Sequence, residues 1–203
     1  MSKQRLEAFS DGVYAIVITL LILSIRIPEV APAALGAALV QMLPEVFTYI
    51  LSFFVVGLYW FAHHRVSHQV KAIDGTFIWL NLIWLLFVSV MPFPAALLGR
   101  YPLQGIPIAI YGADLILANV TGFVITVYLK NHPELAVTPI SSATLRGQAF
   151  IYAATNGAYM VAIAVGWALP WLSYGLYAVV LVWMMVRYAR INNPFQWGGG
   201  RRR

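Results

Sequence analysis

Residues 5–25 read RLEAFSDGVYAIVITLLILSI, which is a basic start followed by an almost unbroken apolar run. An α-helix rises 1.5 Å per residue, so about 20 such residues cross the hydrocarbon core of a membrane. Five further runs of this kind follow, and Pro92 and Pro94 predict a kink near the end of the third. The sequence therefore predicts an all-α membrane protein with a single domain over residues 1–203 and six spans, at residues 6–25, 44–62, 76–98, 107–129, 149–169 and 171–188.

The composition supports a membrane location. Of the 203 residues, 61% are hydrophobic and 10% are charged, whereas soluble domains carry about 25% charged residues. The chain has no cysteine, which excludes disulfides, thiolate nucleophiles and Cys-ligated metal sites. The net charge of +6 is spread over short connectors, a distribution that favours lipid headgroups over nucleic acid as the anionic partner.

The basic residues predict the orientation of the spans, because Lys and Arg are retained in the cytoplasm during insertion. Of the 13 Lys and Arg residues, only Arg26 and Arg100 lie in the odd-numbered connectors. The other eleven lie in the two termini and the even-numbered connectors. We therefore expect both termini in the cytoplasm. The eleven are Lys3, Arg5, Arg65, Lys71, Lys130, Arg146, Arg187, Arg190 and Arg201 to Arg203.

The polar residues within the spans do not form an enzyme site. The segment from Ala62 to His68 resembles a histidine box, but a di-iron site of that type needs about eight histidines and the chain has four. We find no nucleophile beside a base and no phosphate-binding glycine loop. Asp114 suits either a packing hydrogen bond or a role in an outer vestibule, because an acidic residue inside a span needs a partner or a function. The residues favour transport or permeation over catalysis.

The start of the first span resembles the signature of the transmembrane protein 175 (TMEM175) family of potassium channels. The signature is Arg-x-x-x-Phe-Ser-Asp, here Arg5, Phe9, Ser10 and Asp11. Weaker support comes from Trp60, His63, His64, Asn81 and Trp84. The resemblance implies a potassium-permeable channel in a prokaryotic cell membrane, assembled as a homotetramer, with no cofactor and with potassium as the permeant ion.

The resemblance also implies a hydrophobic constriction formed by the first span of each subunit. By spacing from the signature, its residues are Ile16, Leu20 and Leu23, and Thr19 adds a hydroxyl. The helical spacing agrees, because Leu20 lies roughly 40° to one side of Ile16 and Leu23 roughly 20° to the other. The same residues could instead form an ordinary aliphatic face against lipid.

The signature itself is predicted to form a structural network within each subunit. Asp11 lies roughly 140° from Ile16 on the helix, so we expect it to be buried. A buried carboxylate requires donors, and the candidates are His63 or His64, Asn81 and Trp84. The alternative function is a secondary transporter or small-solute permease, with Asp114 and Asn119 as its proton or substrate site. We find no inverted repeat of the kind common in transporters.

Overall fold

The computed structural model describes residues 2–190, and six of its helices are long and apolar enough to cross a membrane. The prediction of an all-helical protein with six spans is confirmed. The six spans comprise α1 (Lys3–Leu21) with the short 3-10 helix η1 (Ile22–Ser24), α3 (Leu43–Gln69), α4 (Gly75–Val90) with α5 (Pro92–Arg100), α6 (Gly105–Asn131), α7 (Ser142–Val165) and α8 (Pro170–Arg190).

Several helices differ in extent from the apolar runs. Helix α3 continues through the histidine-containing segment to Gln69, because helical hydrogen bonding does not stop where a helix leaves the apolar layer. Helix α7 begins at Ser142 instead of residue 149, since the Ser141 side chain accepts a hydrogen bond from the Thr144 backbone N–H and caps the helix. It ends at Val165, and a turn replaces the predicted helix as far as residue 169.

The third span is interrupted at Met91, between α4 and α5. Pro92 and Pro94 have no backbone N–H, so the carbonyls one turn earlier lose their helical donors. The Met91 backbone N–H bonds to the Val88 carbonyl, three residues back. The interruption lies where the two prolines predict a kink.

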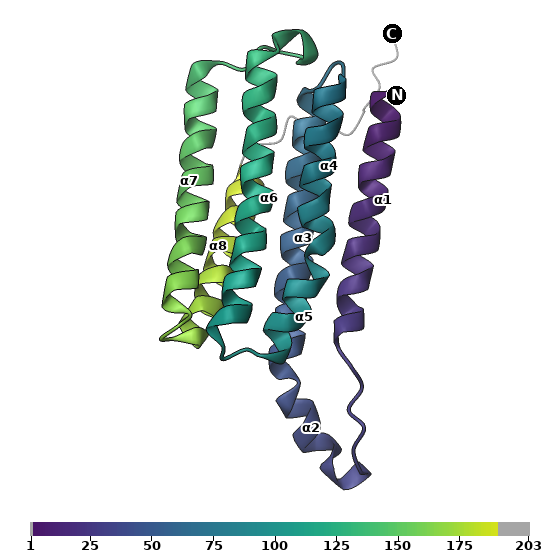
Figure 1. The fold of residues 1–203 in the computed structure, drawn as a ribbon, viewed down its shortest axis with the longest axis vertical. Coiled ribbons are helices and arrows are strands. Elements are labelled where there is room, and N and C mark those ends of the chain that lie inside the picture. The colour runs from purple at the N-terminus through teal and green to yellow at the C-terminus, as the bar shows by residue number, and fades with distance from the viewer. Residues whose placement is uncertain (1, 191–203) are drawn as a thin grey trace.

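The helices form a bundle in which α6 is central and α1 lies at one edge (Figure 1). Helix α6 packs against α7, α4 and α5, whereas α1 packs against α3, α4 and α5. The largest fully buried side chains include Trp84, Tyr14, Tyr111 and Tyr177. These aromatic side chains occupy much of the interior of the subunit.

The segment between α1 and α3 forms an unpredicted projection from the bundle (Figure 1). It contains a 3-10 helix, η2 (Pro32–Ala34), and a short helix, α2 (Leu35–Gln41). Neither has a buried residue. The projection therefore makes no contribution to the core of the single subunit.

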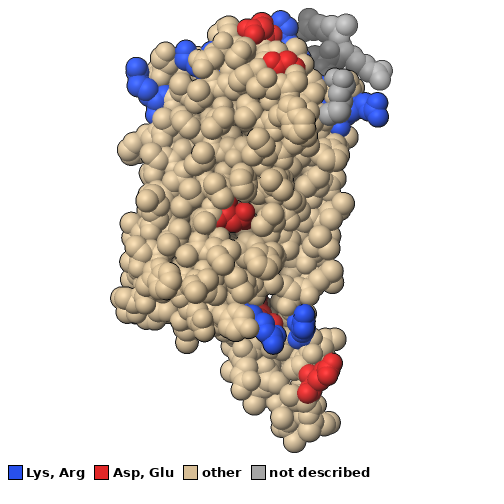
Figure 2. Space-filling model, viewed as in Figure 1, with Lys and Arg blue, Asp and Glu red and all other residues tan. Residues whose placement is uncertain are grey.

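Most charged residues gather at the two ends of the bundle, and the broad tan band between them is interrupted by an acidic patch at mid-height (Figure 2). The start of α1 and the end of α8 lie at the same end of the bundle (Figure 1), which we call the basic end because it carries Lys3, Arg65, Lys71 and Arg187. Two connectors are joined there, since the Lys71 and Val137 backbone N–H groups bond to the carbonyls of Leu135 and Gln69. Arg201 to Arg203 lie outside the described residues.

Candidate permeation site

Helix α1 has one buried face and one exposed face. The buried residues recur at intervals of three or four, as one side of an α-helix requires. They contact α3, α4 and α5. Nothing within the subunit covers the opposite side, although it is largely apolar. The buried residues are Leu6, Ser10, Tyr14, Val17 and Leu21.

The three predicted constriction residues lie on this exposed face. Ile16 is 60% exposed, Leu20 43% and Leu23 71%. Leu23 is not part of the α-helix as predicted, because α1 ends at Leu21 and η1 follows. A 3-10 helix turns roughly 120° per residue, which moves Leu23 to the same side of Ile16 as Leu20. The apolar stripe is therefore narrower than a continuous α-helix would make it.

Thr19 is exposed beside this stripe. Its hydroxyl lies 3.1 Å from the Ala15 carbonyl oxygen and 2.8 Å from that of Ile16, and donates its proton to them. A threonine hydroxyl has one proton and two lone pairs. Because the proton is used within the helix, the oxygen presents its lone pairs outward, where they can accept from water or contact a cation.

Two residues of the signature lie on the exposed face as well, which corrects their placement in an internal network. Phe9 precedes Ile16 by seven residues, so the two lie within roughly 20° of each other on the helix, and Phe9 is half exposed. Arg5 is exposed one turn before Phe9. Gly12 lies between them and Ile16, and a Cβ at that position would meet no atom within 4 Å. The spacing of Phe9 and Arg5 from Ile16 in the sequence was enough to predict that they lie on this face.

Ser10 provides the internal contact of the signature. It is fully buried, donates to the Leu6 carbonyl at 2.9 Å and accepts from the Asn81 side-chain amide at 3.2 Å. The Asn81 carbonyl oxygen lies 2.6 Å from His63 Nε2, so that nitrogen is the donor. The His63 ring also meets the Trp84 ring edge-on, at 5.2 Å between centroids. This network joins α1, α4 and α3.

Asp11 is exposed, and the expectation that it is a buried carboxylate is wrong. Its Oδ1 accepts from Trp60 Nε1 at 2.9 Å, a partner that sequence spacing alone could not identify. His64 stacks on Trp60, and its Nε2 lies 3.0 Å from that of His68. His64 therefore belongs to an exposed ladder on α3 and not to the buried network. Adjacent positions on a helix differ by about 100°, which separates the Ser10 and Asp11 environments.

Two buried polar atoms in the described residues have no hydrogen-bond partner, Trp84 Nε1 and Asp114 Oδ2. Trp84 thus contacts the network through its ring alone.

Asn119, the second residue of the alternative transport site, donates to Asn156 across α6 and α7 at 3.2 Å. Within residues 2–190, no three His, Asp or Glu side chains are grouped to hold a metal ion.

Comparison with known proteins identifies the family. A model described as "Endosomal/lysosomal potassium channel TMEM175" matches residues 5–92. A potassium channel from Chryseobacterium sp. (strain P1-3) is 32% identical over 189 residues, covering 91% of this chain and 94% of the relative. The chain belongs to the TMEM175 family. It is an integral membrane protein, and potassium channels from the bacteria Chryseobacterium sp. and Chamaesiphon minutus match it over nearly its whole length, which places it in a prokaryotic membrane.

A solved structure and a vertebrate relative extend the comparison. The crystal structure of a lysosomal potassium-selective channel TMEM175 homolog from Chamaesiphon minutus has a TM-score of 0.78 and 29% identity, covering 91% of this chain and 97% of that one. The mouse endosomal/lysosomal proton channel TMEM175 is 45% identical over an alignment of 101 positions that covers 45% of this chain and 20% of the mouse protein. The resemblance found in the signature residues is confirmed.

Proposed function

We propose that this protein is the subunit of a homotetrameric, potassium-permeable cation channel in a prokaryotic cell membrane. The α1 helices of four copies line the pore, and Ile16, Leu20 and Leu23 form its hydrophobic constriction. Relatives that cover nine-tenths of the chain carry the name potassium channel. Conduction is passive and uses neither a metal nor an organic cofactor.

The observation that carries this proposal is the uncovered apolar stripe on an edge helix (Figure 1). Next to α1, side chains such as Tyr14 and Trp84 are buried in the interior of the subunit, so an ion pathway along α1 is better placed between copies. A closed ring of identical subunits brings the same surface of each to the symmetry axis. With four copies, each stripe residue becomes a ring of four side chains.

The stripe has the chemistry of a gate that closes by dewetting. Rings of isoleucine and leucine offer water no hydrogen bonds, so a narrow passage through them resists filling until it widens. Ions then pass with part of their hydration removed, which favours potassium because it holds water less tightly than sodium. The outward lone pairs of Thr19 partly replace the lost water.

The basic end faces the cytoplasm, as the distribution of Lys and Arg indicates. Lys71 and Arg100 lie at opposite ends of the bundle and are both exposed. Since the chain has no cysteine, single-cysteine variants report on one position each. In intact cells an impermeant thiol reagent should label Arg100→Cys and leave Lys71→Cys unlabelled. The reverse pattern would mean that the opposite end faces the cytoplasm.

Rubidium flux and reversal potentials in liposomes test the pore. Ile16→Asn places four amides in the constriction, and a barrier lowered by about 1.4 kcal/mol raises flux about tenfold. The potassium-to-sodium permeability ratio should fall, because dehydration is less strictly required. Thr19→Ala should lower that ratio with less effect on flux.

The matched control is Ile18→Asn, since Ile18 packs against the core of its own subunit. It should reduce the yield of assembled protein without raising the flux per channel. Unchanged conduction after Asn substitution at Ile16, Leu20 and Leu23 would remove the pore assignment. Saturating flux coupled to a second solute would instead favour the permease.

A further inference from the structure

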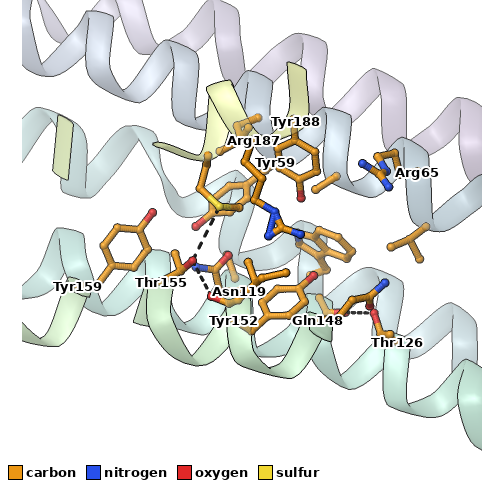
Figure 3. Close-up of a pocket in the computed structure, with 18 of the residues that line it drawn as sticks. Tyr59, Arg65, Asn119, Thr126, Gln148, Tyr152, Thr155, Tyr159, Arg187 and Tyr188 are labelled. Atoms are coloured by element: carbon orange, nitrogen blue, oxygen red, sulfur yellow. Dashed lines mark hydrogen bonds between the residues drawn. The ribbon is translucent and has the colours of Figure 1, made fainter. Parts of the chain in front are cut away.

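A cavity of about 100 Å³ lies within the subunit, away from the exposed face of α1 (Figure 3). It is lined by residues of α3, α6, α7 and α8, and by Trp84 of α4. Arg65 lies one turn before the end of α3 and Arg187 one turn before the end of α8. The cavity therefore lies in the half of the bundle nearer the basic end.

The cavity carries two positive charges and no negative one. Arg65 and Arg187 both line it, and its described lining contains neither Asp nor Glu. Figure 3 shows the Arg187 guanidinium directed into the space. Arg65 lies over the Tyr188 ring, at 5.4 Å from its centroid. The ion pair present among residues 2–190 is Lys3–Glu7, so neither arginine has a carboxylate partner in that part of the chain.

Neutral donors line the cavity beside the two arginines. Gln148 contributes a side-chain amide and Tyr152 a hydroxyl, and both groups can donate hydrogen bonds. Trp84 also lines the cavity, but its Nε1 has almost no accessible surface and is not one of these donors. Two guanidiniums with neutral donors beside them suit a ligand rich in acceptor oxygens.

We propose that this cavity binds a phosphate group, either free or as part of an anionic phospholipid headgroup. Arginine presents a planar set of donors that matches phosphate oxygens, and Gln148 and Tyr152 supply neutral donors. The cavity of about 100 Å³ has room for several waters and therefore for one phosphate group. Basic residues at a cytoplasmic membrane surface are the usual partners of anionic lipids.

Binding would join helices that are distant in the sequence. Arg65 is on α3, Arg187 on α8 and Gln148 on α7, so one phosphate contacts three spans. A ligand that binds only the folded state raises its stability. The site involves none of the residues assigned to the pore, and its test does not depend on conduction.

The test is thermal unfolding of the purified, delipidated full-length protein in an uncharged detergent without phosphate, followed by tryptophan fluorescence. The probes are inorganic phosphate, dioctanoyl phosphatidic acid and, as a control for the acyl chains, dioctanoyl glycerol. At about 100 times Kd, we expect the Tm to rise by about 5 to 10 °C. A rise with phosphatidic acid alone identifies a lipid site, and an equal rise with inorganic phosphate identifies a free-anion site.

The variants locate the effect. Arg65→Gln and Arg187→Gln should abolish the rise, while Arg146→Gln, an exposed arginine on α7 outside the cavity, should retain it. Tyr152→Phe keeps the aromatic ring but removes the hydroxyl that lines the cavity, and should weaken binding severalfold even if an arginine variant does not fold. The proposal is overturned if neither phosphate probe raises the Tm, if dioctanoyl glycerol raises it equally, or if the rise persists in all three cavity variants.

Discussion

Helices α1 and α6 have the same mean hydropathy over their most apolar stretches, yet they occupy opposite environments. Of these stretches, 28% of α1 is buried within the subunit and 56% of α6. Hydropathy identifies both as spans but does not tell which lies at the centre. Lipid is as apolar as a leucine side chain, so burial in a membrane protein depends on close packing and hydrogen bonds.

The glycines of the two helices show what differs. A Cβ on Gly112 of α6 would lie 2.5 Å from the Tyr177 hydroxyl and 2.7 Å from Ile163 Cγ1, closer than atoms can approach. A Cβ on Gly12 of α1 would meet nothing within 4 Å. In α6, Gly112 lets side chains of α7 and α8 approach the backbone closely, whereas Gly12 of α1 has no neighbour within the subunit. A central helix is thus recognised by what its small residues contact.

The same substitution in both helices should give the largest contrast. Gly112→Ala pushes a methyl group into Tyr177, whose hydroxyl is held by the Ile108 carbonyl, and should lower stability by about 1–3 kcal/mol. Gly12→Ala meets no obstacle in the subunit and should leave stability unchanged or raise it by up to about 1 kcal/mol. Thermal unfolding in detergent measures both. Equal losses at the two positions would show that α1 is packed as tightly as α6.

The next largest contrast should be between two contacts of α1, because losing the buried one should reduce stability more than losing the exposed one. Asn81→Leu removes the bridge between Ser10 and His63 and leaves the buried His63 Nε2–H without its acceptor, which should cost about 1–3 kcal/mol. Asp11→Ala loses an exposed hydrogen bond to Trp60 and should cost less than about 1 kcal/mol. Chemical denaturation of the reconstituted protein ranks the two variants. A larger loss for Asp11→Ala would make Asp11, and not Ser10, the anchor of α1.

The smallest expected effect on stability concerns the contacts of α6 and α1 at the basic end of the bundle. Tyr128 near the end of α6 donates to Asp74, which also accepts from the Phe77 backbone N–H and so caps α4. These two hydrogen bonds, the Tyr128 bond foremost, hold the pKa of Asp74 below its ordinary value. Asp74 is only part-buried, so the contribution of its charge should not exceed about 1 kcal/mol. In α1 the corresponding turn has the surface pair of Lys3 and Glu7.

The sign of this effect follows from the lowered pKa. The stabilisation is fully present above the unfolded value of about 3.9 and is lost as the pH falls through the lower folded value. Asp74→Asn retains a capping side chain without the charge. Its Tm should therefore lie below that of the wild type at pH 7, and the difference should shrink below about pH 4. A difference that persists in acid would assign the effect to capping alone.

The sequence predicts the spans and the stripe because both depend on local spacing. Apolar length gives six helices, Pro92 and Pro94 account for the break at Met91, and the positions of Ile16 and Leu20 follow from the turn of one helix. The start of α7 was missed because Ser141 extends the helix beyond its apolar part. The helices of the projection between α1 and α3 were missed because that segment lacks both apolar length and a buried face.

The partners of the signature could not be predicted in the same way. Ser10 and Asp11 are adjacent, and which of them faces inward depends on where α3 and α4 pack. Trp60 reaches Asp11 across 49 positions, and no spacing rule links them. Phe9 and Arg5 were recoverable, since their distance from Ile16 places them on its face.

The Ser10 bridge also limits how α1 can move. Ser10 is tied to Asn81 of α4, and Tyr14, one turn later, donates to the Tyr59 carbonyl of α3 at 3.3 Å. Rotation of α1 about its own axis by one residue would break both hydrogen bonds, at a cost of about 1 kcal/mol for each. In the proposed channel, turning the apolar stripe away from the pore would carry this cost. A tilt or outward shift of α1 together with α3 and α4 would keep both contacts.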